Sequence, residues 1–125
     1  MEYLQRCMAV KQRIVADALT PRESNMKLLI SQVEGWAMAR KIIPNSTPMA
    51  QLLKTMSELG ELADATLKSD EEGVIDGVGD VLITLIIYAA LQGLTIEHCL
   101  REAYEQIKDR KGTLTPEGVF VKEEA

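Results

Sequence analysis

Four acidic side chains fall at helical spacing in the middle of this 125-residue sequence. Glu58 and Glu61 are three positions apart, and Asp76 and Asp80 are four positions apart. Residues at these spacings share one face of an α-helix, so each pair points in one direction. Hard cations such as Mg²⁺ prefer oxygen ligands and often combine protein carboxylates with substrate phosphates. The spacing is therefore consistent with a metal site, and solvated acids on helix faces are the ordinary alternative.

The second acidic pair is interspersed with glycines, namely Gly73, Gly77 and Gly79. In the interior of a helix, each glycine is about 1 kcal/mol less favourable than alanine. Three glycines in such a short stretch therefore predict that another group approaches the helix backbone closely at this point.

The composition indicates one helical domain with an aliphatic core. Hydrophobic residues make up 46% of the chain, but aromatic residues only 4%, and the length is close to the commonest domain size. The formal net charge is −5 and the isoelectric point is about 4.9. Binding to nucleic acid or to an anionic membrane favours the opposite sign, so we expect neither as a partner.

Capping residues and apolar periodicity predict four or five helices with short connections. The start signals are Thr20-Pro21 with Glu23, Thr47-Pro48, a capping box of Ser69 with Glu72, and Thr95, and Gly93 is an end signal. The expected helices span residues 2–19, 21–41, 48–68, 70–92 and 95–110. Residues 1–20 form an N-terminal helical extension, and residues 112–125 form an irregular tail with at most a small hairpin. The predicted fold is an all-α antiparallel bundle in a single domain, 1–125.

The most apolar run, Val81 to Leu94, is 14 residues long. A membrane span needs about 20 residues, so this run is interpreted as a buried helix. It is apolar on nearly every side, which predicts a homo-oligomer, either a dimer or a tetramer, that buries it at an interface. The alternative is the central helix of one compact bundle.

The cysteines and the N-terminus bear on the compartment. Cys7 and Cys99 are far apart and lie outside any CxxC pattern, as expected for reduced thiols. The N-terminal segment has no long apolar core of the kind found in signal peptides. We therefore expect a cytoplasmic location, which would be the host cytoplasm if a phage encodes the chain.

The order of these motifs resembles the MazG-type all-α nucleoside triphosphate pyrophosphohydrolases, in particular their small phage-type members. The shared features are an ExxE pair, an acidic segment of variable length, and a helix that opens with (E/D)xxxD before an aliphatic run. The similarity extends over roughly residues 31–122. It includes the segments VEGWAMARKI, STPMAQLLKTMSELGELADA, DGVGDVLITLIIYAALQGL, YEQIKDRKG and GVFVKE.

This resemblance implies hydrolysis of nucleoside triphosphates, or their deoxy forms, to the monophosphate and pyrophosphate with Mg²⁺, for which Mn²⁺ is a possible substitute. It assigns metal binding to Glu58, Glu61 and Asp80. The family's remaining carboxylate would fall at Gly77, which has no side chain, so Asp76 is expected to substitute. Many relatives also carry a Glu at the position of Ser57. If that acid is the general base elsewhere, Glu58 or Glu61 must serve as the base here.

The resemblance also suggests residues that bind the substrate. Trp36 would stack on the nucleobase and Gln32 would hydrogen-bond its edge, although Trp36 could instead cover the end of the bundle. The candidates for phosphate binding are Lys54, Lys108, Arg110 and Lys111. Basic residues at a helix C-terminus are also favoured by the helix dipole alone.

Two other functions compete with this prediction. A di-iron carboxylate bundle needs ExxH pairs, whereas this chain has one histidine and no ExxH. A catalytically weak binding or interaction module of the same fold, docking through the apolar helix, remains the alternative. The preferred base and sugar are left open.

Overall fold

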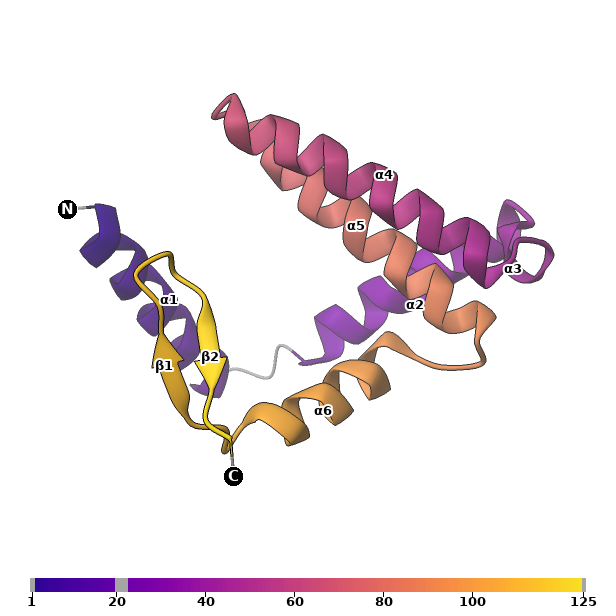
Figure 1. Ribbon diagram of the computed structural model, residues 1–125. Coiled ribbons are helices and arrows are strands. Elements are labelled where there is room, and N and C mark those ends of the chain that lie inside the picture. Colours follow the sequence, from indigo (N-terminus) through magenta and orange to yellow (C-terminus); the bar gives the residue numbers. More distant parts are fainter. Residues whose placement is uncertain (1, 20–22, 125) are drawn as a thin grey trace.

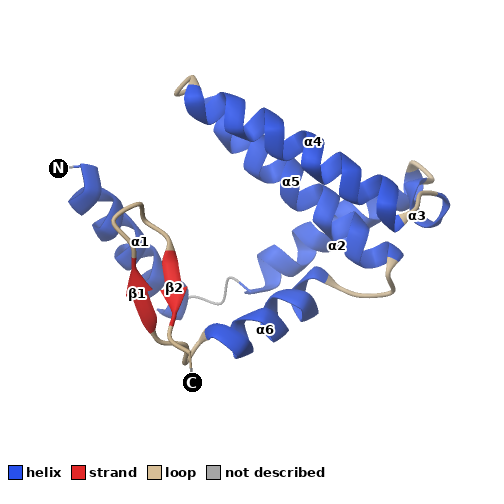
Figure 2. Cartoon of the chain, in the orientation of Figure 1, coloured by secondary structure: helices blue, strands red, loops and turns tan. Residues whose placement is uncertain are grey.

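The computed structural model describes residues 2–19 and 23–124. These residues form six helices followed by one small hairpin (Figure 2). The helices are α1 (Glu2–Leu19), α2 (Glu23–Ala39), α3 (Ile42–Asn45), α4 (Pro48–Leu67), α5 (Glu71–Leu91) and α6 (Ile96–Ile107). The strands are β1 (Gly112–Leu114) and β2 (Phe120–Lys122). The expected all-α class is confirmed.

The centre of the fold is the antiparallel pair of α4 and α5 (Figure 1). Helix α2 crosses α5, and α3 and α6 each contact one part of it. Within the described residues, α1 packs against no other helix or strand, and Figure 1 shows it apart from the α4–α5 pair. The buried apolar core is correspondingly small: Ile30, Ala37, Ala65, Ile86, Ile87 and Ala89. A closed bundle is therefore not completed inside one chain.

The helix starts follow the predicted caps at two positions. The hydroxyl oxygens of Thr47 and Thr95 each accept a backbone N–H three residues later, at 3.1 Å in both cases. The predicted capping box at Ser69 is wrong, because Asp70 is the N-cap and accepts from the Gly73 N–H at 3.0 Å. Ser69 instead has a left-handed backbone, with φ 53°, and therefore belongs to the turn. The expected cap at Thr20 lies outside the described residues.

The ends of α5 and α6 and the tail can be compared with the expectation. Gly93 has φ 73° and follows α5, as its type predicts. Helix α6 ends at Ile107, before the expected residue 110. The tail contains the small hairpin that the sequence allowed, in which β1 and β2 pair antiparallel with Thr113 opposite Val121.

Helix α5 is longer than the apolar run that it contains. Its 21 residues include an 18-residue window with mean hydropathy 2.0, which would be long and apolar enough to cross a membrane. The 14-residue length of the apolar run therefore does not by itself distinguish this helix from a membrane span. Asp76 and Asp80 lie on this helix and α4 packs along it, which are features of a core helix. Only 28% of the window is buried within the chain, so much of its apolar surface needs a further partner.

Candidate active site

Two cavities meet at Asp80. The larger has a volume of about 730 Å³ and lies between α2, α4 and α5. The smaller, of about 310 Å³, lies between α4 and the first half of α5. Asp80 lines both cavities. Small-molecule sites occupy roughly 300–1,000 Å³ and are mostly apolar with a few polar groups, so the larger cavity has the size and character of a ligand pocket.

The larger cavity has mainly apolar walls with a few polar side chains. Val33, Ile83 and Ile87 are among the apolar residues that line it. The predicted base-binding residues Gln32 and Trp36 also line it, on α2. The Trp36 ring is half exposed and lies 5.7 Å, centroid to guanidinium carbon, from Arg40. The exposed ring is therefore available as a flat wall rather than sealed in the core.

The smaller cavity is strongly acidic. Five acids line it, together with Lys68: Glu61, Asp64, Asp70, Asp76 and Asp80. The ammonium group of Lys68 is already paired with Asp64 at 2.9 Å. The other four carboxylates therefore leave an excess of negative charge at this end of the site.

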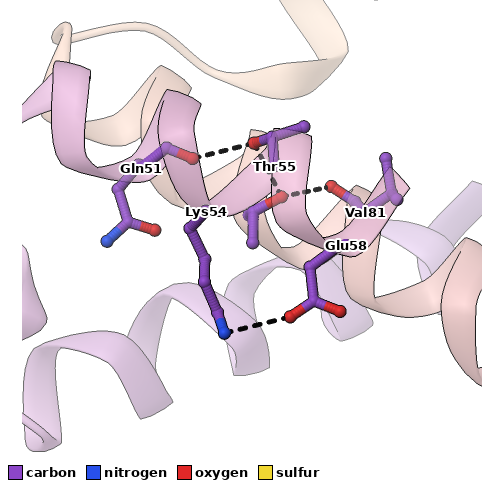
Figure 3. A network of polar contacts seen from close by, with 6 residues as sticks. Gln51, Lys54, Thr55, Glu58 and Val81 are labelled. Carbon is purple, nitrogen blue, oxygen red and sulfur yellow. Dashed lines mark hydrogen bonds and ion pairs between the residues drawn. The ribbon is translucent and has the colours of Figure 1, made fainter. Parts of the chain in front are cut away.

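Glu58 is the acid that the fold buries. It is only 7% exposed, and its Oε1 is paired with the Nζ of Lys54 at 3.1 Å (Figure 3). Its Oε2 is buried and has no hydrogen-bond partner among the described residues. A buried carboxylate oxygen without a donor is costly, so this atom is oriented for a further cationic or proton-bearing group.

Three of the acids, Glu58, Glu61 and Asp80, have shifted pKa values. The neighbouring carboxyl group of Glu58 raises the pKa of Glu61, and Glu61 in turn lowers the pKa of Glu58. Lys54 contributes further to the lowered pKa of Glu58. Burial, then the charges of Asp76 and Glu58, raise the pKa of Asp80. The predicted carboxylates on α4 and α5 are therefore close enough to interact electrostatically.

A buried pair of threonines ties these two helices together. The hydroxyl groups of Thr55 and Thr84 lie 2.9 Å apart, and both residues are buried. Thr84 donates to the Val81 carbonyl at 2.7 Å, and the Thr55 hydroxyl lies 2.9 Å from the Gln51 carbonyl (Figure 3). Thr55 is three residues from Glu58, and Thr84 is four residues from Asp80. This contact therefore fixes how the acids of one helix face those of the other.

Gly77 is a point of close approach between α5 and α4. A Cβ placed there would lie 3.1 Å from both Cβ and Cδ1 of Leu62, so an added side chain would require Leu62 to shift by a few tenths of an ångström. The group that approaches the backbone at this point is therefore α4 itself. The same is not true of Gly79, which has open space around it. The neighbouring Asp76 lies on the acidic cavity, where the carboxylate missing at Gly77 was expected.

These residues fit a hard divalent cation by their chemistry. As the side chains stand, no three Asp, Glu, His or Cys groups in the described part of the chain lie close enough to hold an ion. However, the donors are all carboxylate oxygens, one of them is buried without a partner, and two of the acids have raised pKa values. Added positive charge would relieve all of these features.

The basic residues near the C-terminus do not join the site within one chain. Lys108, Arg110 and Lys111 line neither cavity. Lys108 is paired with Glu105 at 2.7 Å, at the end of α6 that points away from the α4–α5 pair (Figure 1). Of the four predicted phosphate-binding residues, only Lys54 lines the larger cavity.

The fold and the site define an all-α protein with paired acidic helices beside a pocket large enough for a nucleoside. The sequence profile of the MazG nucleotide pyrophosphohydrolase domain matches residues 46–115, more than half of the chain. The chain therefore belongs to this family. The match covers α4, α5 and α6, which include all four acids, and leaves Gln32 and Trp36 of α2 outside it.

One curated relative comes from Haemophilus phage HP1 (strain HP1c1), an uncharacterised 18.2 kDa protein in the rep–hol intergenic region. It is 33% identical over 66 residues, which cover 53% of this chain and 40% of the relative. The chain thus spans less than half of that relative's length. No solved structure matches the chain.

Proposed function

We propose that the protein hydrolyses nucleoside triphosphates, or their deoxy forms, to the monophosphate and pyrophosphate, and that it does so with Mg²⁺. The observation that carries this proposal is the position of Asp80, which lines both the apolar and the acidic cavity. A triphosphate placed across this border would have its nucleoside among apolar walls and its phosphates beside the acids. The family membership supports a nucleotide pyrophosphohydrolase.

In this proposal Glu58, Glu61, Asp76 and Asp80 hold the cation. When bound, it would supply positive charge for the phosphates and lower the pKa of a coordinated water. Mn²⁺ should substitute, since it accepts similar oxygen donors.

Glu61 is the better candidate for the general base of the pair. Its raised pKa makes it the stronger base, whereas Glu61 and Lys54 lower the pKa of Glu58. Glu61 would accept the proton of the attacking water, which then attacks phosphorus in line with the departing pyrophosphate. Lys54, which lines the larger cavity and lies 3.1 Å from Glu58, would bind a phosphate oxygen.

We further propose that the protein acts as a homo-oligomer in the cytoplasm. Ile75, Val78 and Leu82 lie on one face of α5 and are 67%, 54% and 41% exposed. A second copy covering this face would remove it from water. Lys108, Arg110 and Lys111 could contact phosphate only if the end of α6 reached the cavities of another copy.

The test is pyrophosphate release from the eight common ribo- and deoxyribonucleoside triphosphates, with Mg²⁺ and with EDTA. We expect metal-dependent release that Glu61→Gln reduces by at least about 100-fold, since general bases typically contribute 10²–10⁴-fold. Glu72→Gln is the matched control, because Glu72 is exposed and lines neither cavity. The alternative, an interaction module, predicts no metal-dependent release and no effect of Glu61→Gln.

A further inference from the structure

We infer that Gln51, held in place by Ser46, reads the edge of the nucleobase and sets the base preference of the enzyme. This inference rests on the proposed function, because it assigns a role within the same substrate site. It concerns a pair of residues that the acidic motifs do not include.

Gln51 lies on the same face of α4 as the residues proposed to act on the phosphates. Gln51, Lys54 and Glu58 are spaced i, i+3 and i+7, and all three line the larger cavity. Figure 3 shows the Gln51 and Lys54 side chains projecting from the same side of the helix. At 1.5 Å per residue, Gln51 and Glu58 are separated by about 10 Å along the axis. This is similar to the length of a nucleoside with its first phosphate, so a substrate with phosphates near Glu58 would have its base near Gln51.

The side-chain amide of Gln51 is fixed before any ligand arrives. Its Nε2 donates to the Oγ of Ser46 at 3.0 Å, in a part-buried contact. Its backbone carbonyl is hydrogen-bonded to Thr55 at 2.9 Å, and Thr55 in turn contacts Thr84 on α5. By contrast, Gln32 on α2 is exposed, and the described residues offer its amide no hydrogen bond. Gln51 would therefore lose less conformational entropy than Gln32 on binding.

The direction of the amide determines what it can recognise. The bond to Ser46 uses one amide hydrogen and leaves Oε1 as an acceptor and the second hydrogen as a donor. Glutamine can form a two-point contact with adjacent acceptor and donor atoms of a base. The apolar walls make an unmet hydrogen bond costly here, which is the condition under which an active site rejects the wrong substrate strongly. Ser46 acts as a positioning residue in this arrangement.

The experiment measures kcat/KM for all eight triphosphates with the wild type, Gln51→Met and Ser46→Ala. Methionine keeps the length of the side chain but removes the amide. We expect Gln51→Met to reduce the ratio between the best and worst base by about ten-fold or more, mainly through KM. Ser46→Ala should give a smaller loss of the same ratio with little change in kcat. Gln106→Met is the control, because Gln106 is exposed on α6 and lines neither cavity.

A binding titration separates this inference from the proposed function. Trp36 is the only tryptophan in the chain and lines the same cavity, so its fluorescence reports occupancy by nucleoside monophosphates in EDTA. Gln51→Met should flatten the preference among the four bases in this assay as well. If the wild type hydrolyses triphosphates but the base ratios of Gln51→Met stay within two-fold of it, the inference is wrong and the proposed function stands. If the wild type neither binds nor hydrolyses any nucleotide, both are wrong.

Discussion

Thr55 and Thr84 are 29 positions apart in the sequence, yet their hydroxyl groups share a buried hydrogen bond of 2.9 Å between α4 and α5. Each hydroxyl also contacts a backbone carbonyl of its own helix, from Gln51 and Val81 respectively. The contact therefore joins the two helices that carry the four acids.

We expect Thr55→Val to lower the free energy of unfolding by about 1 kcal/mol, because it removes the hydroxyl that bonds to Thr84 and to the Gln51 carbonyl with little change in the shape of the side chain. Denaturant unfolding measures this. The double variant with Thr84→Val should lose less than the sum of the single losses, since both remove the same contact. Thr66→Val is the control, because its hydroxyl is exposed and bonds only to the Leu62 carbonyl. Strict additivity would mean that the two hydroxyls do not interact.

Gly77→Ala and Gly79→Ala should have opposite effects on stability. A Cβ added at position 77 would lie 3.1 Å from the Leu62 side chain. A Cβ added at position 79 would have no atom of another element within 4 Å. Overpacking costs about 1–3 kcal/mol, and the helix preference for alanine contributes about 1 kcal/mol. Thermal unfolding of both variants checks this. A stabilised Gly77→Ala would show that Leu62 can shift enough to accommodate the added methyl group.

Asp80→Asn should stabilise the protein in EDTA at neutral pH, by about 2–5 °C in Tm. The pKa of Asp80 is raised above its ordinary value of 3.8 in the folded state, so the ionised group destabilises the fold above the folded pKa. This penalty decreases as the pH falls through the folded pKa, because the group becomes neutral. The advantage of the variant should therefore disappear near pH 3–4.

Glu58→Gln provides the contrast for this measurement. The pKa of Glu58 is lowered, so its ionised form stabilises the folded protein and its loss should not raise Tm at neutral pH. If both substitutions stabilised the protein equally, the cause would be the smaller net negative charge of the chain. The particular environment of Asp80 would then not explain the result.

Mg²⁺ at millimolar concentration should raise the Tm of the wild type, because a ligand that binds only the folded state stabilises it. The shift should decrease as the pH is lowered, since protons compete for Glu61 and Asp80, whose pKa values are raised. The double variant Glu61→Gln/Asp80→Asn should lose the shift. An equal shift in this variant would place the cation elsewhere.

Val78→Asp should convert an oligomer into smaller species, as measured by light scattering after size exclusion. Val78 is 54% exposed on the apolar face of α5, and a charge there would be costly to bury in an interface. Leu67→Asp is the control, because Leu67 is 85% exposed at the end of α4. A wild-type mass near the 13.9 kDa of one chain would contradict the proposed assembly.

The sequence by itself determined five of the six helices of the described residues, all except α3, and the spacing of the acids along α4 and α5. Local signals are sufficient for this, since Thr47, Thr95 and Gly93 act on their own turns, and spacings of three and four place side chains on one face whatever the helix packs against. The error at Ser69 has a local cause as well, because the adjacent Asp70 competes for the same cap.

Only the tertiary structure decided how the two acidic pairs meet. The close approach at Gly77 and the bond between Thr55 and Thr84 depend on residues that are distant in sequence, and periodicity along one helix contains no information about its neighbour. The same is true of the cavity that brings Gln51 of α4 near Trp36 of α2. The polar residues at positions 51, 54 and 58 could have indicated from the sequence that this face of α4 binds a ligand. The cavity in front of this face, however, forms only when the helices pack.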